Sequence, residues 1–391
     1  MKALTSTKVS NVGRCFVRAT ARVGAFSAIM FLPLLAGAQT LNITNGVQKY
    51  GSLAGTTVNM SGKCELWVTN SSNPVSGCTI NLNSIDAWLF LPGTKPSVAA
   101  STYLGQVRVS GAAAVADSNV RVVQYSAGAV VIPQPASFQP LTVFSGLEFG
   151  GSSVKYSQYT YYTGGAVGSF RSFKLKRGYM AVLAQDVNGA NYSKCYIAQD
   201  GDLEIGVLPA TLDNQVKFIY VTPWRWVNKK GIAGDPGISL LNVSSWYDWN
   251  IDQNSSRDLE YVAIEQQPFW PGLGQNWKAL GINTLLGYNE PDNPTQDAYK
   301  NLTPPGSVSD AVARWPGLLG TGLRVGSPAV TDGGRSSWLY PFISQADAAG
   351  RRVDFVAVHY YQAHNPADPS GAASQMYNFL LDIWNNTHRP I

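Results

Sequence analysis

The chain has 391 residues, enough for about two or three domains with separate hydrophobic cores. Charged residues make up only 14% of the sequence and aromatic residues 11%, a balance typical of extracellular, β-rich proteins. The formal net charge of +5 comes from 29 basic and 24 acidic residues, and five of the basic residues lie among the first 22 residues. The rest of the chain is close to neutral, which argues against nucleic-acid binding and against attachment to anionic membranes.

The N-terminus has the order of a secretory signal peptide. Basic residues precede an apolar segment, Val23–Leu35, and the small residues Ala36-Gly37-Ala38 follow it. We expect cleavage after Ala38 and a secreted product, periplasmic or extracellular. The apolar segment is too short to span a bilayer, so we expect no membrane association once the signal peptide, residues 1–38, is removed.

The cysteines are interpreted from this export signal. Cys15 leaves with the signal peptide. Cys64 and Cys78 flank a turn-rich loop and are the pair that we expect to form a disulfide in an exported protein. Cys195 then has no partner, and the spacing of the cysteines predicts no metal site.

Residues 39–140 are predicted to form a β-rich domain. Short apolar runs alternate with Gly, Ser, Asn and Pro, which favours an all-β domain over βαβ units. The pattern leaves two alternatives open, a sandwich and a small β-solenoid. The expected strands include Cys64–Thr69, Ala87–Leu91, Gln106–Val109, Val120–Gln124 and Ala129–Ile132.

Residues 141–228 are predicted to form a second β domain. Phe144 and Phe149 are followed by Gly151, Ser152 and Tyr156. This arrangement resembles the Greek-key motif of the βγ-crystallins, in which aromatic residues form a corner and a glycine adopts a backbone conformation that other residues avoid.

Microbial βγ-crystallins often bind calcium through paired Asn/Asp residues followed two residues later by Ser/Thr-Ser. Here Asp213-Asn214 is followed by Lys217-Phe218, so most of the oxygen ligands are missing. We therefore expect no calcium site.

From Lys229 onward, strand-like runs alternate with helix-length segments, which predicts a parallel α/β architecture. The expected strand ends are Gly231-Ile232, Ser245–Asn250, Tyr261–Glu265, Thr284–Glu290, Val325–Val330 and Phe355–Tyr361. The expected helices are Trp277–Leu280, Ser309–Leu319, Ser337–Ala349 and Met376–Trp384. An eightfold barrel has about 250 residues, so residues 229–391 are expected to form a partial (β/α)8 TIM barrel with about six of the eight βα units, truncated at its C-terminus.

Five motifs occur in order at these strand ends. They are Lys230-Gly231, Ser245–Trp249, Leu286–Asp292, Gly326–Ala329 and Val353–Tyr361. Together they resemble glycoside hydrolase family 128, the alkali-sensitive-linkage type catalytic domain, over about residues 229–391. The resemblance implies a TIM barrel of the large retaining clan that cleaves β-1,3-glucan without a cofactor.

The central motif ends an apolar run with a carboxylate, Glu290, between Asn289 and Pro291. Retaining hydrolysis needs a carboxylic acid that protonates the leaving oxygen and a carboxylate ~5 Å away that attacks the sugar. The resemblance implies that Glu290 is the acid/base and that Asn289 bonds the sugar 2-hydroxyl. The alternative for Glu290 is a surface glutamate before a proline turn.

The family's nucleophile is a glutamate that follows a segment like Arg389-Pro390-Ile391. We therefore expect the nucleophile to be missing from these 391 residues, and the fragment itself to be inactive.

Other polar and aromatic residues lie at the same strand ends. Candidate substrate contacts are Trp246, Tyr247, Trp249, His359, Tyr360 and Tyr361. His359 or one of the two tyrosines is expected to orient the nucleophile or to contact the sugar, although a histidine that ends an apolar strand is often only a core residue. The third strand carries Ala263-Ile264-Glu265 where the family has proline and methionine, and Glu260 and Glu265 are further carboxylates without an assigned role.

The sequence thus predicts a secreted, monomeric hydrolase that cleaves β-1,3-glucan with retention and whose partner is the polysaccharide. The alternatives are a non-catalytic β-glucan-binding or cell-wall-associated protein, and a related β-glycanase that acts on another polysaccharide.

Overall fold

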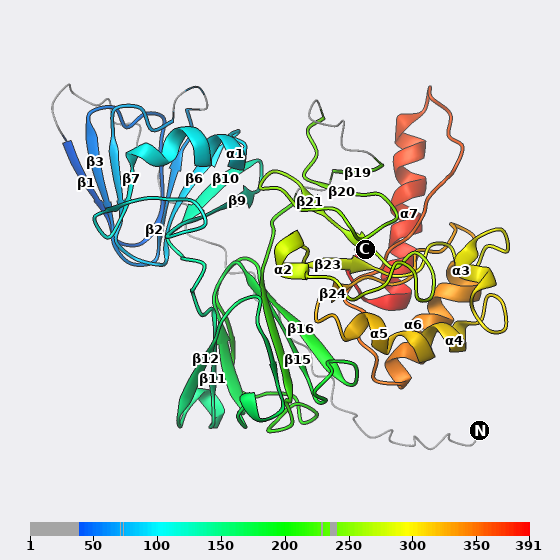
Figure 1. The fold of residues 1–391 in the computed structure, drawn as a ribbon. Coiled ribbons are helices and arrows are strands. Elements are labelled where there is room, and N and C mark those ends of the chain that lie inside the picture. Colours follow the sequence, from blue (N-terminus) through cyan, green and yellow to red (C-terminus); the bar gives the residue numbers. More distant parts are fainter. Residues whose placement is uncertain (1–38, 71, 73, 228–229, 235–240) are drawn as a thin grey trace, which may run out of the picture. The chain divides into compact units, whose positions relative to one another are not determined.

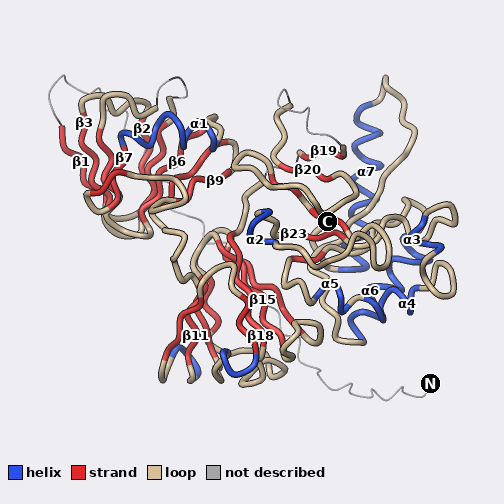
Figure 2. Tube along the Cα trace, viewed as in Figure 1, coloured by secondary structure: helices blue, strands red, loops and turns tan. Residues whose placement is uncertain are grey.

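The computed structural model describes residues 39–70, 72, 74–227, 230–234 and 241–391. The predicted signal peptide and Cys15 lie outside the described residues. Two parts built almost entirely of strands are followed by a part that contains most of the helices (Figures 1 and 2). Each part is described by itself. Among the described residues, no helix has the length and apolar character needed to cross a membrane.

The first part consists of two five-stranded sheets, in the orders β1-β3-β5-β7-β8 and β2-β4-β6-β10-β9. Strands β1 to β7 pair in parallel within each sheet and alternate between the sheets, which is the winding of a solenoid. The strands are β1 (Gln39–Ile43), β2 (Gly46–Tyr50), β3 (Thr56–Met60), β4 (Cys64–Val68), β5 (Thr79–Leu82), β6 (Ala87–Pro92), β7 (Val107–Val109), β8 (Ala112–Ala113), β9 (Arg121–Tyr125) and β10 (Gly128–Ile132). A short helical segment precedes β7: α1 (Pro96–Val98), η1 (Ala99–Tyr103) and η2 (Leu104–Gln106).

Alternating burial along β3 and β4 explains how the two sheets of this part share one core. Val58 and Met60 on β3 and Leu66 and Val68 on β4 are fully buried, while the residues between them are partly exposed. Successive side chains of a strand point to opposite faces, so one face of each sheet supplies a common core. Of the two alternatives that the sequence left open, the structure shows the solenoid.

The predicted disulfide is wrong for this structure, in which Cys64, Cys78 and Cys195 are free thiols. The Cys64 thiol donates to the Ile43 carbonyl (3.5 Å) and the Cys78 thiol to the Val75 carbonyl (3.1 Å). Both side chains are packed in the core, where burial raises the pKa of Cys78 to about 11. Each therefore serves as a small buried apolar residue.

The second part consists of two four-stranded antiparallel sheets, in the orders β12-β11-β14-β17 and β13-β18-β15-β16. The elements are β11 (Leu141–Phe144), η3 (Leu147–Phe149), β12 (Ser153–Tyr156), β13 (Tyr161–Thr163), η4 (Gly164–Ala166), β14 (Ser172–Leu175), β15 (Tyr179–Ala184), β16 (Ser193–Ala198), β17 (Leu203–Ile205) and β18 (Phe218–Pro223).

The predicted aromatic corner of this part is confirmed. The rings of Phe144 and Phe149 meet edge to face with centroids 5.7 Å apart. Gly151 has φ +77°, and a Cβ there would lie 2.3 Å from the Ser145 hydroxyl oxygen, so glycine is required on both counts. The Asp213 carboxylate accepts hydrogen bonds from Nε (2.9 Å) and Nη2 (2.8 Å) of Arg171, so a cation of the chain itself occupies it.

The third part has parallel strands in two three-stranded sheets, β19-β20-β21 and β22-β23-β24. The strands are β19 (Gly231–Ala233), β20 (Ser245–Tyr247), β21 (Glu260–Tyr261), β22 (Ala263–Ile264), β23 (Thr284–Leu286) and β24 (Arg324–Val325). The helices are α2 (Trp277–Leu280), α3 (Asp297–Lys300), α4 (Val308–Arg314), α5 (Pro316–Leu319), η5 (Arg335–Leu339), α6 (Tyr340–Ala348) and α7 (Pro369–Thr387).

A barrel of six regular βα units is not confirmed. The strands are shorter than predicted. Residues 355–358 form no regular strand and pair with the segment after β24 only through the single bridges Gly326–Phe355 and Val330–Val358. No helix lies between β19 and β21 among the described residues. The loop Asp248–Asp258 is rich in Asp, Asn and Ser, so it offers no apolar face with which a helix could cover these strands.

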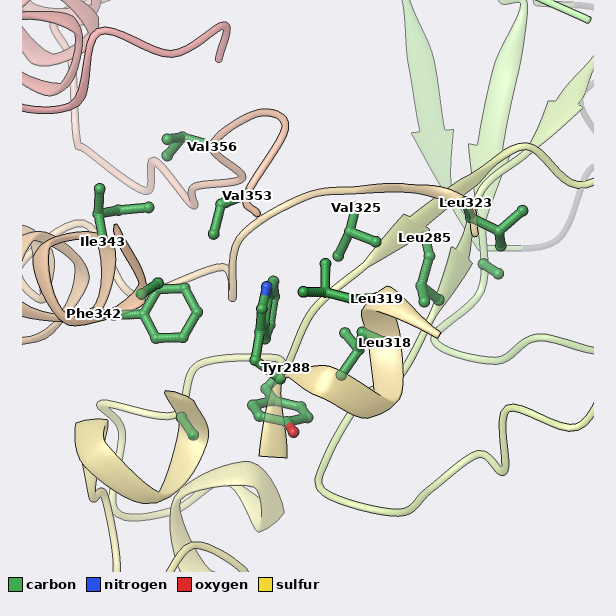
Figure 3. Close-up of a cluster of buried hydrophobic side chains, with 14 of the residues drawn as sticks. Leu285, Tyr288, Leu318, Leu319, Leu323, Val325, Phe342, Ile343, Val353 and Val356 are labelled. Carbon is green, nitrogen blue, oxygen red and sulfur yellow. The ribbon is translucent and has the colours of Figure 1, made fainter. Parts of the chain in front are cut away.

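One core joins the strands β23 and β24 to the helices α5 and α6 (Figure 3). Trp315 lies fully buried at its centre, with its ring 4.9 Å from that of Phe342. A Cβ on Gly287 would lie 2.8 Å from the Trp315 ring, so glycine at this position lets the tryptophan approach the strand. The residue that follows, Tyr288, starts the segment that carries the candidate site.

Candidate active site

Three strand ends bring the candidate residues together. Asn289 forms a parallel bridge with Ala329, and Val330 forms one with Val358. The segments after β23, after β24 and at residues 355–358 therefore end side by side. Polar groups that follow the carboxyl ends of parallel strands collect at one edge of a sheet, where barrel enzymes place their active sites.

Glu290 is held at this edge through its backbone and its side chain. Its N–H donates to the Ala329 carbonyl (2.7 Å), and its φ of 45° turns the chain away from the strand direction. Carboxylate oxygen Oε2 accepts a hydrogen bond from Nδ2 of Asn293 (2.9 Å), and Oε1 lies 2.6 Å from Nδ1 of His359. Both members of the His359–Glu290 pair are shielded, with side-chain exposures of 16% and 12%.

A left-handed backbone is unusual for a glutamate and costs of the order of 1 kcal/mol or more. Such strain persists where the surrounding structure fixes it, and here the hydrogen bonds to Ala329, Asn293 and His359 do so. The side chain is also shielded, in contrast to the alternative of a surface glutamate before a proline turn.

Asn289 is almost fully buried beside Glu290. Its N–H donates to the Gln266 carbonyl (2.8 Å), and its side-chain amide donates to Oε1 of Gln296 (3.4 Å). Asn289 and His359 also line a cavity of about 670 Å³. This volume lies within the range of ~300–1,000 Å³ found for small-molecule sites.

The predicted aromatic residues take different positions around this cavity. Trp246 and Tyr247 line it, and Trp246 is buried against Tyr261 with ring centroids 4.8 Å apart. Trp249 is 38% exposed, and its ring lies 5.2 Å from that of Tyr247. Burial raises the pKa of Tyr247, and the nearby Tyr361 acts in the same direction.

The residues after His359 diverge. Tyr361 is 77% exposed, and its ring lies 5.6 Å from the His359 ring. The Tyr360 ring packs against Phe379 of α7 at 4.8 Å. A role for Tyr360 as a substrate contact therefore stays a prediction, without a contact in the structure that favours it.

The two further carboxylates of the third strand point to different environments. Glu260 lines the cavity and accepts a hydrogen bond from the Thr284 hydroxyl (3.2 Å), and burial raises its pKa. Glu265 does not line this cavity, although burial raises its pKa to about 7. Neither makes a hydrogen bond to Glu290 in the structure.

Sequence reasoning missed Asn293 and Gln296, which bond Glu290 and Asn289. Asn293 is three residues after Glu290, and this short spacing in a polar loop was the available signal. A bond across such a spacing requires the chain to reverse, and the positive φ of Glu290 produces that turn.

The chain was compared with known proteins. Residues 235–385 match the family model described as a glycosyl hydrolase catalytic core. The comparison with curated proteins gives no match. Among solved structures, the chain is similar to a family 128, subgroup I, endo-β-1,3-glucanase from Amycolatopsis mediterranei in complex with laminaritriose, at 32% identity over 41% of this chain and 67% of that chain, with a TM-score of 0.35.

Two further solved structures are similar to this chain. One is a family 128, subgroup VII, oligosaccharide-binding protein from Trichoderma gamsii, at 21% identity over 41% of this chain and 63% of that chain, with a TM-score of 0.31. The other is a βγ-crystallin domain from Flavobacterium johnsoniae, at 22% identity over 21% of this chain and 93% of that chain, with a TM-score of 0.19. On the match of the family model and the identity to the Amycolatopsis glucanase, the chain belongs, through its C-terminal part, to glycoside hydrolase family 128.

Proposed function

We propose that the protein is a secreted glycoside hydrolase that cleaves β-1,3-glucan with retention, and that Glu290 is its general acid/base. The observation that carries the proposal is the Glu290 carboxylate, fixed by Asn293 and His359 at a strand end beside the cavity. Family membership supports the reaction class, and the laminaritriose complex of the Amycolatopsis relative supports the substrate class.

The contact between His359 and Glu290 suits a group that must both give and take a proton. When Glu290 is ionised, the Nδ1–H of His359 donates to Oε1, and when Glu290 is protonated, its hydroxyl donates to the neutral imidazole. In the first step Glu290 would protonate the leaving glycosidic oxygen, and in the second it would accept a proton from water.

Retention needs a second carboxylate as the nucleophile. In the family it follows a segment like Arg389-Pro390-Ile391, so the proposal assigns this role to none of the described carboxylates. Asn289 is proposed to bond the sugar 2-hydroxyl, a contact that would strengthen as the transition state forms. Trp246, Tyr247, Trp249 and Tyr361 are proposed to contact the sugar rings, and no cofactor is required.

The test incubates the protein expressed from its gene with laminarin. Release of β-1,3-oligosaccharides is expected. Replacement of Glu290 by Gln should lower the rate about 10²- to 10⁴-fold, the usual contribution of a general acid/base. Glu204→Gln, at an exposed glutamate in β17, is the matched control and should leave the rate unchanged.

Two results would change the proposal. Retardation of the protein in a laminarin gel without product at any pH would favour a non-catalytic β-glucan-binding protein. Hydrolysis of xylan or mannan in place of laminarin would favour a related β-glycanase.

A further inference from the structure

A second cavity lies beside the segments that follow strands β22 and β23. Its volume is about 280 Å³, and Glu265, Phe269, Leu273, Tyr288, Arg314 and Gly317 line it together with Gly272. It shares no lining residue with the cavity beside Glu290. The third strand explains the separation, because Val262 and Ile264 face the first cavity and Glu265, the next residue, faces away from it.

Glu265 is unusual because its carboxylate is buried without an ion-pair partner in the described residues. Its side chain is only 5% exposed, and its Oε1 accepts a hydrogen bond from the Phe269 N–H (3.2 Å). Its second oxygen, Oε2, is buried and has no hydrogen-bond partner among the described residues. A buried polar atom without a partner costs about 1–3 kcal/mol, so it is a place where a ligand hydroxyl would be stabilised.

The cavity wall combines groups that donate with groups that accept. The Arg314 guanidinium, whose Nε donates to Oδ2 of Asp310 (2.8 Å), lies 4.6 Å from the centre of the Phe269 ring. The Tyr288 ring is buried at the edge of the core, and its hydroxyl points away from Leu318 and Leu319 (Figure 3).

The rim of the cavity is apolar and exposed. Phe269 is 74% exposed although large apolar residues are normally buried, and its backbone has φ +67°. Strain of this kind clusters at binding sites, where it holds a side chain in a required direction. Leu273 adds a second apolar surface.

These features select the chemistry of the occupant. Arg314 disfavours a cation and Glu265 disfavours an anion, whereas a neutral polyol offers hydroxyl groups that donate to the carboxyl and accept from the guanidinium. The aromatic rim suits the C–H face of a sugar ring. The volume lies just below the ~300–1,000 Å³ of ordinary ligand sites, so it has room for one ring but not for a chain.

We propose that this cavity binds a single glucosyl unit at the end of a β-glucan chain, outside the catalytic cleft. The choice of glucose among neutral sugars rests on the proposed function. Such a site would hold a chain end on the enzyme while another segment of glucan is in the cleft.

Binding of methyl β-D-glucopyranoside and of laminaritriose to the 391-residue chain tests the proposal by saturation-transfer NMR and titration calorimetry. Gly317 lines the cavity on its helix side, so a leucine there should narrow it. The leucine should not disturb the fold, because no atom lies within 4 Å of a Cβ added at Gly317. Ala313→Leu, which introduces the same side chain at an exposed position of α4 outside the cavity, is the control. Glu265→Gln removes the carboxylate, and Asn289→Ala weakens the cleft alone.

Binding of the glucoside should survive Asn289→Ala and Ala313→Leu. It should weaken about tenfold with Glu265→Gln, which corresponds to the loss of roughly one hydrogen bond to a charged group. Gly317→Leu should also weaken it about tenfold, because the added side chain takes up space in the cavity. Melting temperatures of all variants show whether they fold. Glucoside binding that is absent from the wild type, or unaffected by both cavity variants, would overturn the proposal. Binding that follows the cavity variants in a protein that never hydrolyses laminarin would instead refute the proposed function and leave this site in place.

Discussion

The carboxylate of Glu290 depends on His359 for its orientation. Replacement of His359 by Ala removes the partner of Oε1 and leaves only Asn293 on the carboxylate, so the acid/base group loses its fixed direction. Because a misplacement of about 1 Å costs ~100-fold in rate, we expect kcat to fall by about that factor with little change in KM. Steady-state kinetics of the protein expressed from its gene, with laminarin as substrate, measure both constants.

The role of His359 in positioning can be separated from a role in folding. His359→Asn keeps a short side chain with an N–H donor and should recover part of the lost kcat, and it should shift the pH profile relative to the wild type. His364→Ala, at an exposed histidine of the following loop, should have no effect. An unchanged kcat in His359→Ala would contradict the assignment.

Glu265 gives the fold a dependence on pH. Burial raises its pKa from 4.5 to about 7, so the folded chain binds this proton more tightly than the unfolded chain does. The free energy of unfolding therefore falls by up to ~3 kcal/mol as the pH rises from about 4.5 to about 7, and it stays lower above that range.

Glu265→Gln keeps an oxygen for the Phe269 N–H and removes the charge. We expect the variant to melt at a higher temperature than the wild type at pH 8 and to lose that advantage at pH 4.5. Scanning fluorimetry across this range measures the difference. Glu204→Gln should show no such trend, and an advantage of Glu265→Gln that does not change with pH would contradict the assigned pKa.

At this scale the sequence singled out Glu290, Asn289 and His359 as candidates but not Asn293 and Gln296, which bond the first two. One of His359, Tyr360 and Tyr361 was expected to orient the nucleophile or to contact the sugar, and the structure adds a contact of His359 with Glu290. That pairing depends on the register of three neighbouring strand ends and on a positive φ at Glu290, and neither leaves a signal in residue type.

At the scale of elements, the corner between β11 and β12 depends on Gly151. An alanine there would meet both a left-handed backbone and the Ser145 hydroxyl, 2.3 Å from its Cβ. We expect Gly151→Ala to lower the free energy of unfolding by about 1–3 kcal/mol. Gly165→Ala, at a glycine with no atom within 4 Å of an added Cβ, is the control. Denaturant unfolding compares the two, and equal stabilities would contradict the role of Gly151.

The helices show what a sequence pattern can predict. The bounds of α2, Trp277–Leu280, are as predicted, because Asn276 caps its first turn and Gly281 ends it in a left-handed conformation. The single predicted helix Ser309–Leu319 is divided at Trp315 and Pro316, since proline has no N–H to continue the hydrogen bonds. The strands were overestimated, because apolar runs report burial whereas strand bounds depend on pairing partners elsewhere in the chain.

At the scale of the whole molecule, the predicted cleavage after Ala38 would leave the described part of strand β1, Gln39–Ile43, intact. Within it, Gln39 pairs with Thr56 of β3 and donates its N–H to the Gly55 carbonyl (3.3 Å). Cleavage at Ala38 would keep all of β1, whereas cleavage a few residues later would remove part of its pairing with β3. We therefore expect the exported protein to begin at Gln39.

Removal of the predicted signal peptide would also change the charge of the whole protein. Residues 1–38 carry five basic and no acidic residues, so the remaining chain would retain 24 of each sign where the full sequence has 29 and 24. Intact mass and isoelectric focusing of the exported protein should show an N-terminus at Gln39 and an isoelectric point well below the 8.9 of the full sequence. Ala38→Phe places a bulky residue at the cleavage site and should leave the precursor uncut, with its basic isoelectric point. An exported wild-type product that retains residues 1–38 would refute the prediction. The exported protein would then keep five more basic residues and would not be close to neutral.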